Sequence, residues 1–418
     1  MRLRKVGAIA LVGVLALAGC TQGGTSGGKG TIKVGIDLPL QGSELAGSQP
    51  VINGAQLALK QAKGTAGGYT VEIPKALILD DAINGAHDPQ TGAKNAGVLI
   101  ADSKVVGMLG PLNSNVAKAQ IPLTNEAGLF QCSPANTNES LTKPEFGALD
   151  VRKAKPTEIN YVRVATTDDL QGPANAIYLF KIGVKKLYII DDTETFGAGI
   201  AKNVEAKFKA LGGEVVGHDS VPKTTTDYAS ILTTAKAKNP DGIYFGGVTA
   251  TGGARILKAA IQVGLNVPYM GPDGIQDGSG ETKDSFLNLA GADAKNAYAT
   301  LAGKGTFPGQ DQFLKDYKAE YNIDATGYAI QGYGCMQIIL DAIGRAGATN
   351  PSGDAAVRAA VRKAGSDPTY TYKTAMGDIQ FDANGDTSQK IVSVYKVDPA
   401  GANGKGAWVL AEEVNPTQ

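Results

Sequence analysis

Apolar runs of strand length alternate along the chain with longer segments of helical periodicity, and this order restricts the fold more than any other feature. In the first part of the chain, strands are expected at residues 31–36, 75–80, 105–110 and 128–132. Helices are expected between them, at residues 54–63, 88–101 and 114–127. Because a strand–helix–strand unit places its two strands in parallel, this order predicts a parallel sheet flanked by helices.

A second series of the same plan follows, so the sequence predicts two α/β halves. Its strands are expected at residues 161–164, 186–190, 214–216, 242–245 and 267–270. Its helices are expected at residues 174–180, 197–211, 228–237 and 253–263. Residues 297–301 are then expected to return the chain to the first half, where helices follow at residues 310–321 and 328–346. An antiparallel pair of strands is expected at residues 391–397 and 407–410.

The N-terminus has the features of a bacterial secretory signal. Three basic residues precede an apolar run over residues 6–17, which is too short to span a bilayer as a helix. The run leads into Leu-Ala-Gly-Cys, ending at Cys20, and this resembles the lipobox of bacterial lipoproteins. We therefore expect residues 1–19 to be a signal peptide, Cys20 to carry lipid, and residues 20–30 to form a flexible tether. The protein is thus expected outside the cytoplasm, anchored to the cell membrane.

The charge balance and the scarcity of reactive side chains exclude several functional classes. Lys+Arg and Asp+Glu number 40 each, and loss of the three basic residues of the signal leaves 37 against 40, a net charge of −3. Nucleic-acid binding needs an excess of basic residues, so no nucleic-acid partner is expected. The chain has two histidines and three cysteines, and no catalytic or nucleotide-binding motif at a strand–helix turn. We therefore predict no enzymatic activity, no metal and no cofactor.

Four loops that follow expected strands carry small and polar residues. In open α/β sheets, ligands bind beyond the carboxyl ends of the strands. These loops are residues 110–115, 133–138, 191–197 and 270–274. In the first of them, Ser114 stands where the next helix begins, and free backbone N–H groups there favour an anion such as a carboxylate. In the last, Asp273 offers one carboxylate.

These loops resemble those of the type I periplasmic-binding proteins of the branched-chain amino acid class, which are substrate-binding lipoproteins of ABC transporters. The most specific stretch is SPANTNESLT at residues 133–142, and the resemblance runs from about residue 31 to the end. It implies two Rossmann-like lobes that are joined by three crossings and close on a ligand in the cleft between them. The expected first lobe is residues 31–162 plus 297–380, and the expected second lobe is residues 163–296 plus 381–418.

The resemblance also implies which residues hold the two charged ends of an amino acid. In amino-acid-binding members, a Ser after the Gly-rich turn and an Ala and a Thr in the next loop hold the α-carboxylate. These positions match Ser114, Ala135 and Thr137, and we expect Asn136 in the same set. A carboxylate of the second lobe binds the α-ammonium and matches Asp273. A zwitterion needs both partners, because a buried charge costs several kcal/mol unless it is paired.

The wall around the ligand departs from the family pattern. Two family tyrosines are replaced by Phe196 and Val248, which makes this wall more apolar. Ser43, in the first strand-end loop, is expected at the rim. Structural roles stay open for the same residues: Asp273 is also a turn former after Pro272, and Ser114 is also a helix cap.

The expected function is capture of a neutral, branched-chain-like amino acid by a monomer that delivers it to the permease subunits of an ABC transporter. A small amide or an aromatic acid is the alternative ligand, and a sensor module of the same fold is the alternative function. An enzyme on this scaffold would need paired carboxylates, and no motif brings two candidates into one site. Those candidates are Asp80, Asp81, Asp168 and Glu194.

Cys132 and Cys335 are both expected in the first lobe, the former at a strand end and the latter on the helix at residues 328–346. Outside the cytoplasm they could pair, and two buried free thiols are the alternative. A disulfide requires Cα atoms within about 7 Å of each other, which depends on the tertiary structure.

Overall fold

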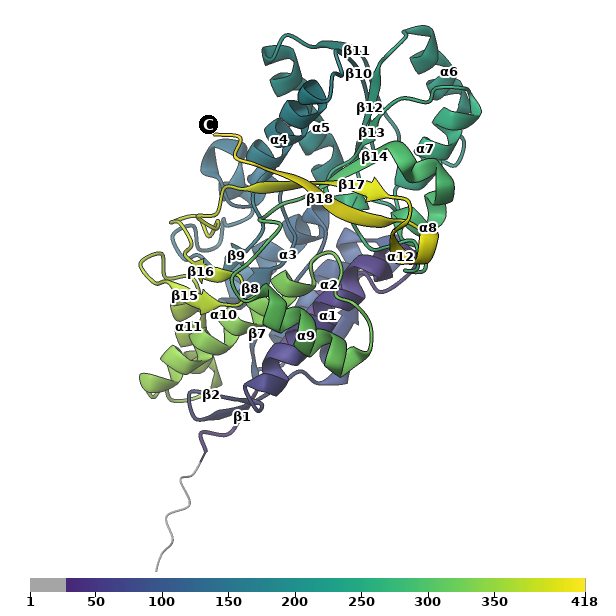
Figure 1. The fold of residues 1–418 in the computed structure, drawn as a ribbon. Helices are drawn as coiled ribbons and strands as arrows, with labels where there is room; N and C mark the ends of the chain where they lie inside the picture. Colours follow the sequence, from purple (N-terminus) through teal and green to yellow (C-terminus); the bar gives the residue numbers. More distant parts are fainter. Residues whose placement is uncertain (1–27, 418) are drawn as a thin grey trace, which may run out of the picture.

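The computed structural model describes residues 28–417 and consists of two α/β lobes, each built around its own sheet (Figure 1). This confirms the fold class expected from the alternation of strands and helices. The expected signal peptide at residues 1–19, the lipidated Cys20 and most of the tether lie outside the described residues. Between residues 28 and 417, no helix has both the length and the apolar character needed to cross a membrane.

The first sheet is parallel apart from a hairpin at its edge. Its strands follow the order β2-β3-β1-β7-β8-β9, and β4 also pairs with β1. Their bounds are β1 (Thr31–Leu38), β2 (Thr65–Ala66), β3 (Tyr69–Glu72), β4 (Ile78–Asp80), β7 (Val105–Leu109), β8 (Phe130–Ser133) and β9 (Tyr161–Arg163). Only β2 and β3 are antiparallel among these pairs, so the carboxyl ends of β1, β7 and β8 meet at one edge.

Helices cover both faces of the first sheet (Figure 1). They are α1 (Glu44–Gln61), α2 (Pro89–Ala101), α3 (Ser114–Ala127), α9 (Gln310–Tyr321), α10 (Ala329–Ala348) and α11 (Asp354–Gly365). Helix α1 packs along α10, and α2 packs along α3. Successive side chains of a strand point to opposite faces, so Val106 packs in the core with α1 and α10, while Val105 packs with Leu99 of α2.

The second sheet is parallel from β11 to β14 and antiparallel beyond. Its order is β11-β10-β12-β13-β14-β17-β18. The strand bounds are β10 (Lys186–Asp191), β11 (Glu214–Ser220), β12 (Gly242–Gly246), β13 (Tyr269–Met270), β14 (Ala297–Leu301), β17 (Val392–Asp398) and β18 (Ala407–Val414). The flanking helices are α4 (Asp168–Lys181), α5 (Thr195–Ala210), α6 (Ala229–Ala237), α7 (Gly253–Gln262) and α8 (Phe286–Ala290). The antiparallel pair expected at the end of the chain is β17 and β18.

The chain passes between the lobes three times, and one lobe boundary differs from the expectation. Residues 297–301 are expected in the first lobe, whereas they form β14, which pairs with β13 and β17 of the second sheet. This short run could pair in either sheet, so only its partners decide where it lies. The crossings lie side by side: Thr166 N donates to Ala302 O over 2.9 Å, and Gln389 Nε2 donates to Thr166 Oγ1 over 3.1 Å.

A disulfide joins Cys132 of β8 to Cys335 of α10, with the two Cα atoms 5.7 Å apart. Of the two alternatives left open by the sequence, the structure thus has the disulfide. Both cysteines are fully buried in the core of the first lobe. The bond links residues 203 positions apart in the sequence and ties α10 to the sheet that carries the loops after β7 and β8.

Replacing both cysteines by Ala is expected to lower the free energy of unfolding by about 2–5 kcal/mol, because the unfolded chain regains the entropy that the cross-link removes. Urea unfolding followed by circular dichroism measures this difference. A reductant should lower the unfolding midpoint of the wild type and leave that of the double variant unchanged. Equal midpoints for the oxidised wild type and the double variant would contradict a stabilising disulfide.

Candidate ligand-binding cleft

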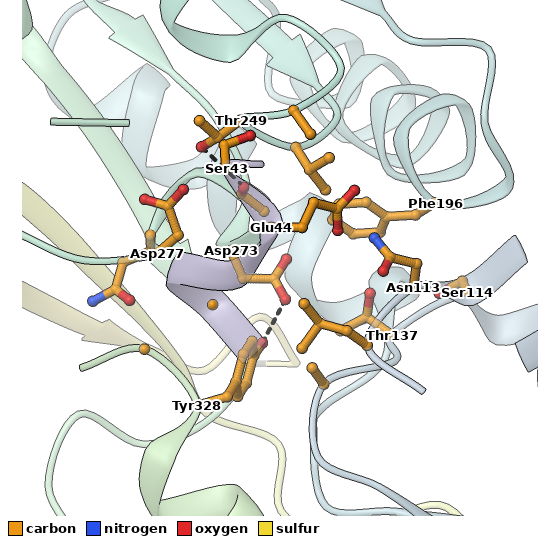
Figure 2. Close-up of a pocket in the computed structure, with 18 residues that line it drawn as sticks. Ser43, Glu44, Asn113, Ser114, Thr137, Phe196, Thr249, Asp273, Asp277 and Tyr328 are labelled. Atoms are coloured by element: carbon orange, nitrogen blue, oxygen red, sulfur yellow. Dashed lines mark hydrogen bonds between the residues drawn. The ribbon is translucent and has the colours of Figure 1, made fainter. Parts of the chain in front are cut away.

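A cavity lies between the lobes, where loops from the carboxyl ends of strands of both sheets face each other (Figure 2). The first lobe contributes loops after β1, β7 and β8, and the second lobe contributes loops after β10, β12 and β13. Seven of the residues expected at the site line this cavity, namely Ser43, Ser114, Ala135, Thr137, Phe196, Val248 and Asp273. The parallel order of the strands therefore brings these distant residues together, because it gathers their carboxyl ends at one edge of each sheet.

The first-lobe wall is made by two loops that are hydrogen-bonded to each other. Ser114 is the first residue of α3, after β7, and Thr137 lies in the loop after β8. Ser133 Oγ donates to Pro111 O over 2.9 Å, and Asn138 N donates to Ser114 Oγ over 3.4 Å. These bonds hold Thr137 beside the N-terminus of α3, where unpaired N–H groups and the helix dipole favour an anion.

Gly110 allows the loop after β7 to approach the neighbouring strand. Its φ is +117°, a backbone conformation that favours glycine. A Cβ atom at this position would lie 2.1 Å from the backbone oxygen of Asp37 in β1, which leaves no room for a side chain. The close approach places the start of α3 at the cavity.

Asn136 does not line the cavity, contrary to the sequence expectation. Its side chain is turned into the first lobe, where Nδ2 donates to Leu112 O over 2.7 Å and Oδ1 accepts from Tyr161 Oη over 2.9 Å. Asn136 is almost fully buried in this position. Both ends of its amide are hydrogen-bonded within the first lobe. Asn136 therefore holds the loop that carries the lining residues Ala135 and Thr137, and it does not line the cavity itself.

Asp273 presents an unpartnered carboxylate oxygen at the cavity. It begins a short 3₁₀ helix after β13 and is 7% exposed. Oδ2 accepts a hydrogen bond from Tyr328 Oη, and the backbone N donates to Gln171 Oε1 over 3.1 Å. Oδ1 has no hydrogen-bond partner. Burial raises the pKa of Asp273 to about 6, so the carboxyl group is mostly ionised at neutral pH.

One part of the second-lobe wall is apolar. Phe196 stands in the first turn of α5, and Val248 follows β12. Thr249 N donates to Gly274 O over 3.0 Å, which joins the loop after β12 to the loop that carries Asp273. Both loops therefore belong to one rigid second-lobe wall, and Phe196 lies across the cavity from Asp273 (Figure 2).

Several lining residues were not expected from the sequence. Glu44 begins α1, next to the expected Ser43, and Asn113 precedes the expected Ser114. Asp277 lies one turn beyond Asp273, while Tyr328 reaches the cavity from the segment that leads into α10. Asn113 lies within an expected strand-end loop, and Glu44 and Asp277 follow shortly after such loops, which was a signal for their selection. Tyr328 had no such signal, because it follows the second crossing and no strand of its own lobe directly precedes it.

The cavity is acidic. Its lining has three carboxyl groups, Glu44, Asp273 and Asp277, and no Lys or Arg. Burial raises the pKa of Asp277 to about 7, whereas the pKa of Glu44 is lowered by His87 in spite of burial. An anion without an ammonium group would meet an unfavourable potential in such a cavity, and a group that brings positive charge to Asp273 would be stabilised.

The four carboxylates considered as enzyme candidates in the sequence, Asp80, Asp81, Asp168 and Glu194, lie outside the cavity lining. Asp168 is instead fully buried at the start of α4, and burial raises its pKa well above the usual range. Across residues 28–417, no cluster of three or more His, Cys, Asp or Glu side chains is placed to hold a metal ion.

Known proteins match this fold over nearly its whole length. The family model described as periplasmic binding protein matches residues 31–405. Leu/Ile/Val-binding protein homolog 2 of Brucella abortus is 27% identical over 384 residues, which cover 90% of this chain and 92% of that protein. The Leu/Ile/Val-binding protein BraC3 of Rhizobium johnstonii is 26% identical over 366 residues, which cover 87% of this chain and 91% of its own.

Solved structures agree with these matches. The leucine-binding protein LivK of Thermotoga maritima has a TM-score of 0.77 and 25% identity, covering 93% of this chain and 99% of its own. A solute-binding protein of an ABC transporter from R. palustris, in complex with benzoate, has a TM-score of 0.73 and 21% identity. The match covers 92% of this chain and 97% of that chain. The latter likeness concerns the fold alone. The matched region contains the whole cleft and all of both sheets except β18, so the chain belongs to the type I periplasmic binding proteins, in their branched-chain amino acid class.

Proposed function

We propose that this protein captures a neutral, branched-chain-like amino acid outside the cytoplasm and delivers it to the permease of an ABC transporter, anchored through lipid on Cys20. The observation that carries the proposal is the buried Oδ1 of Asp273, which lines the cavity without a hydrogen-bond donor. A buried carboxylate oxygen is costly unless it meets a donor, and an ammonium group supplies both a donor and the opposite charge.

The opposite side of the cavity suits the carboxylate of the same amino acid. Ser114 and Thr137 line the cavity near the N-terminus of α3 (Figure 2), and Ala135 lines it as well. Hydroxyl donors and a helix N-terminus are partners for an anion that add no full positive charge. The α-carboxylate would bind the first lobe and the α-ammonium would bind Asp273 of the second, so the ligand would bridge the lobes.

Such bridging accounts for how the ligand would favour lobe closure. Direct bonds already join the lobes at and beside the cavity, among them Asn138 Nδ2 donating to Thr195 O over 3.0 Å and Tyr328 Oη donating to Asp273 Oδ2. A ligand held from both sides adds charge-assisted contacts that exist only when the lobes are closed. By differential binding it would shift the population towards the closed form, which is the form a permease could recognise.

An aromatic acid is the second candidate ligand, because Phe196 and Val248 make one wall apolar. Such an acid could use Ser114 and Thr137 as the amino acid does, but it would bring no ammonium to Asp273. The carboxylate of Asp273 would then face a second anion in a buried site, which costs several kcal/mol. The amino acid is therefore the better match.

Thermal melts of the purified protein with a panel of L-amino acids, small amides and aromatic acids test this proposal. We expect a neutral amino acid to raise the melting temperature, since a ligand at 100 times its Kd stabilises the folded state by about 2.7 kcal/mol. Each hit is repeated with its des-amino analogue, which keeps the carboxylate and the side chain. Stabilisation by an aromatic acid and by no amino acid would overturn the proposal.

A further inference from the structure

The cavity holds a second polar group that the two ends of an amino acid do not use. It consists of Glu44, the first residue of α1, and Asn113, the residue that precedes α3. Both side chains line the cavity on the first-lobe side, and Figure 2 shows the Asn113 amide next to the Glu44 carboxylate, with the Phe196 ring beside them. Glu44 is 6% exposed and Asn113 is 7% exposed, so few of their hydrogen bonds can be made to water.

His87 pairs with Glu44 and stabilises its ionised form. The Glu44 Oε1 atom pairs with the ring Nδ1 of His87 and also accepts from the His87 backbone N over 3.2 Å. Burial opposes both charges, yet this pairing lowers the pKa of Glu44 and raises that of His87. The charged groups near His87 are Lys223, which donates to its backbone oxygen, and Glu194, which pairs with Lys223 over 3.2 Å. The charge of Glu44 is therefore already balanced by protein groups, and no second cation is needed from a ligand.

The orientation of the Asn113 amide follows from Glu44. Figure 2 draws the amide nitrogen of Asn113 on the side of the Glu44 carboxylate, so the NH₂ group faces the carboxylate. Oδ1 of Asn113 is then left without a partner inside the protein. Leaving a buried acceptor unpaired costs about 1–3 kcal/mol. The other cavity-lining side-chain atoms that lack partners, Asp273 Oδ1 and Gln276 Oε1, are also acceptors, so the described lining calls for hydrogen-bond donors.

We propose that Glu44 and Asn113 form a subsite that accepts a hydrogen bond from a hydroxyl or amide group on the side chain of the ligand. This narrows the proposed function: among neutral amino acids, the ligand would have a polar side chain, such as one of the shape of threonine or asparagine, in place of a purely aliphatic branched one. This inference rests on the proposed function, because it takes the α-carboxylate and α-ammonium to occupy Ser114 and Asp273. A plain aliphatic side chain would leave the Asn113 oxygen unpaired, whereas a hydroxyl or amide group would satisfy it.

Isothermal titration at pH 7 with pairs of nearly isosteric amino acids tests the subsite. We expect L-threonine to bind about 10–100-fold more tightly than L-valine, and L-asparagine similarly more tightly than L-leucine, from the cost of an unpaired acceptor. Asn113→Ala should reduce the threonine-to-valine ratio towards one. Asn113 makes no side-chain cap bond to α3, so this variant keeps the helix start. Asn266 is exposed, is absent from the cavity lining and has no left-handed backbone conformation, so Asn266→Ala provides the control.

The possible outcomes separate the two proposals. Equal or tighter binding of valine and leucine would overturn the polar subsite and leave the amino-acid function intact. Tighter binding of L-lysine or L-ornithine than of threonine would overturn the neutral character of the side chain. Binding of no amino acid would overturn the proposed function itself. An unchanged threonine-to-valine ratio in Asn113→Ala would show that Asn113 does not contact the side chain of the ligand.

Discussion

Asp273→Asn is expected to weaken binding of the amino acid about 100-fold or more, because the substitution removes one partner of a buried ion pair. The Asn side chain has nearly the same shape, and its oxygen can still accept from Tyr328. The fold should therefore persist, while the ammonium loses its counter-ion. Titration calorimetry measures the affinity, and an equal unfolding midpoint without ligand confirms the fold. Asp311→Asn, at an exposed position in the first turn of α9, is the matched control.

The pH dependence gives the same test without a change in sequence. The pKa of Asp273 is raised to about 6, and an ammonium group would lower it on binding. The affinity of the wild type should therefore fall as the pH drops through about 6, by up to tenfold for each further unit. Asp273→Asn should lose the part of this dependence that falls near pH 6 and keep any part that comes from Asp277, whose pKa is about 7. Wild-type affinity in the variant, or equal pH profiles for both proteins, would assign Asp273 a structural role.

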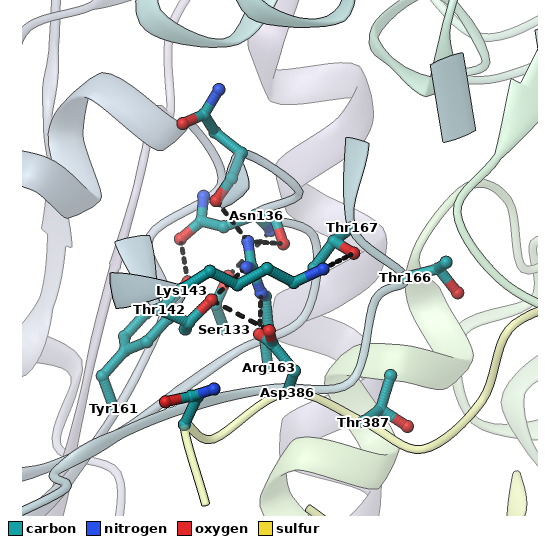
Figure 3. Close-up of polar contacts among 12 residues, drawn as sticks. Ser133, Asn136, Thr142, Lys143, Tyr161, Arg163, Thr166, Thr167, Asp386 and Thr387 are labelled. Atoms are coloured by element: carbon teal, nitrogen blue, oxygen red, sulfur yellow. Dashed lines mark hydrogen bonds and ion pairs between the residues drawn. The ribbon is translucent and has the colours of Figure 1, made fainter. Parts of the chain in front are cut away.

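Arg163→Met is expected to lower the free energy of unfolding by about 3–5 kcal/mol, because it leaves the buried charge of Asp386 without its partner. Arg163 is fully buried at the end of β9, and its Nε donates to Asp386 Oδ1 over 2.7 Å (Figure 3). Nη1 donates to Asn138 O over 2.7 Å, and Nη2 donates to Thr142 Oγ1. One side chain thus joins the first and third crossings to the loop that carries Thr137.

Urea unfolding measures this loss, and Lys181→Met is the control. Lys181 pairs with Glu412 over 2.5 Å, but its side chain is 61% exposed, so its removal should cost less than about 1 kcal/mol. Arg163→Met combined with Asp386→Leu should recover part of the loss, since no charge is then left buried. A stability of Arg163→Met equal to that of the control would contradict an anchoring role for this pair.

Much of the fold could be predicted because it follows from local patterns. Short apolar runs and helical periodicity predicted two parallel sheets, and pairings such as β1 with β7 and β10 with β12 confirm them. The place of β14 was predicted wrongly, because its five residues match an interior strand of either sheet. The segment at residues 75–80 was expected to be a strand throughout, whereas it begins as a 3₁₀ helix, Lys75–Leu77, before β4. Both errors concern short segments whose state depends on their neighbours.

The site could be predicted where its residues lie in recognisable loops. Ser114, Thr137 and Asp273 were expected from loops at strand ends, and these residues line the cavity. Asn136 was expected beside them, but its amide points into the first lobe, where Nδ2 donates to Leu112 O. Tyr328 was missed because its contact with Asp273 joins residues 55 positions apart in different lobes. Such a contact has no trace in the sequence near either residue.

The amino-acid sequence by itself determined the class of fold, the family and most of the loops that line the cavity, because periodicity and loop composition are local properties of the chain. Only the tertiary structure decided the pairing of Cys132 with Cys335, the orientation of Asn136 and the place of β14. It also decided that Glu44 meets His87, 43 positions away, inside the cavity wall. The physical reason is that pairing, burial and charge balance depend on which distant residues the crossings and sheets bring into contact.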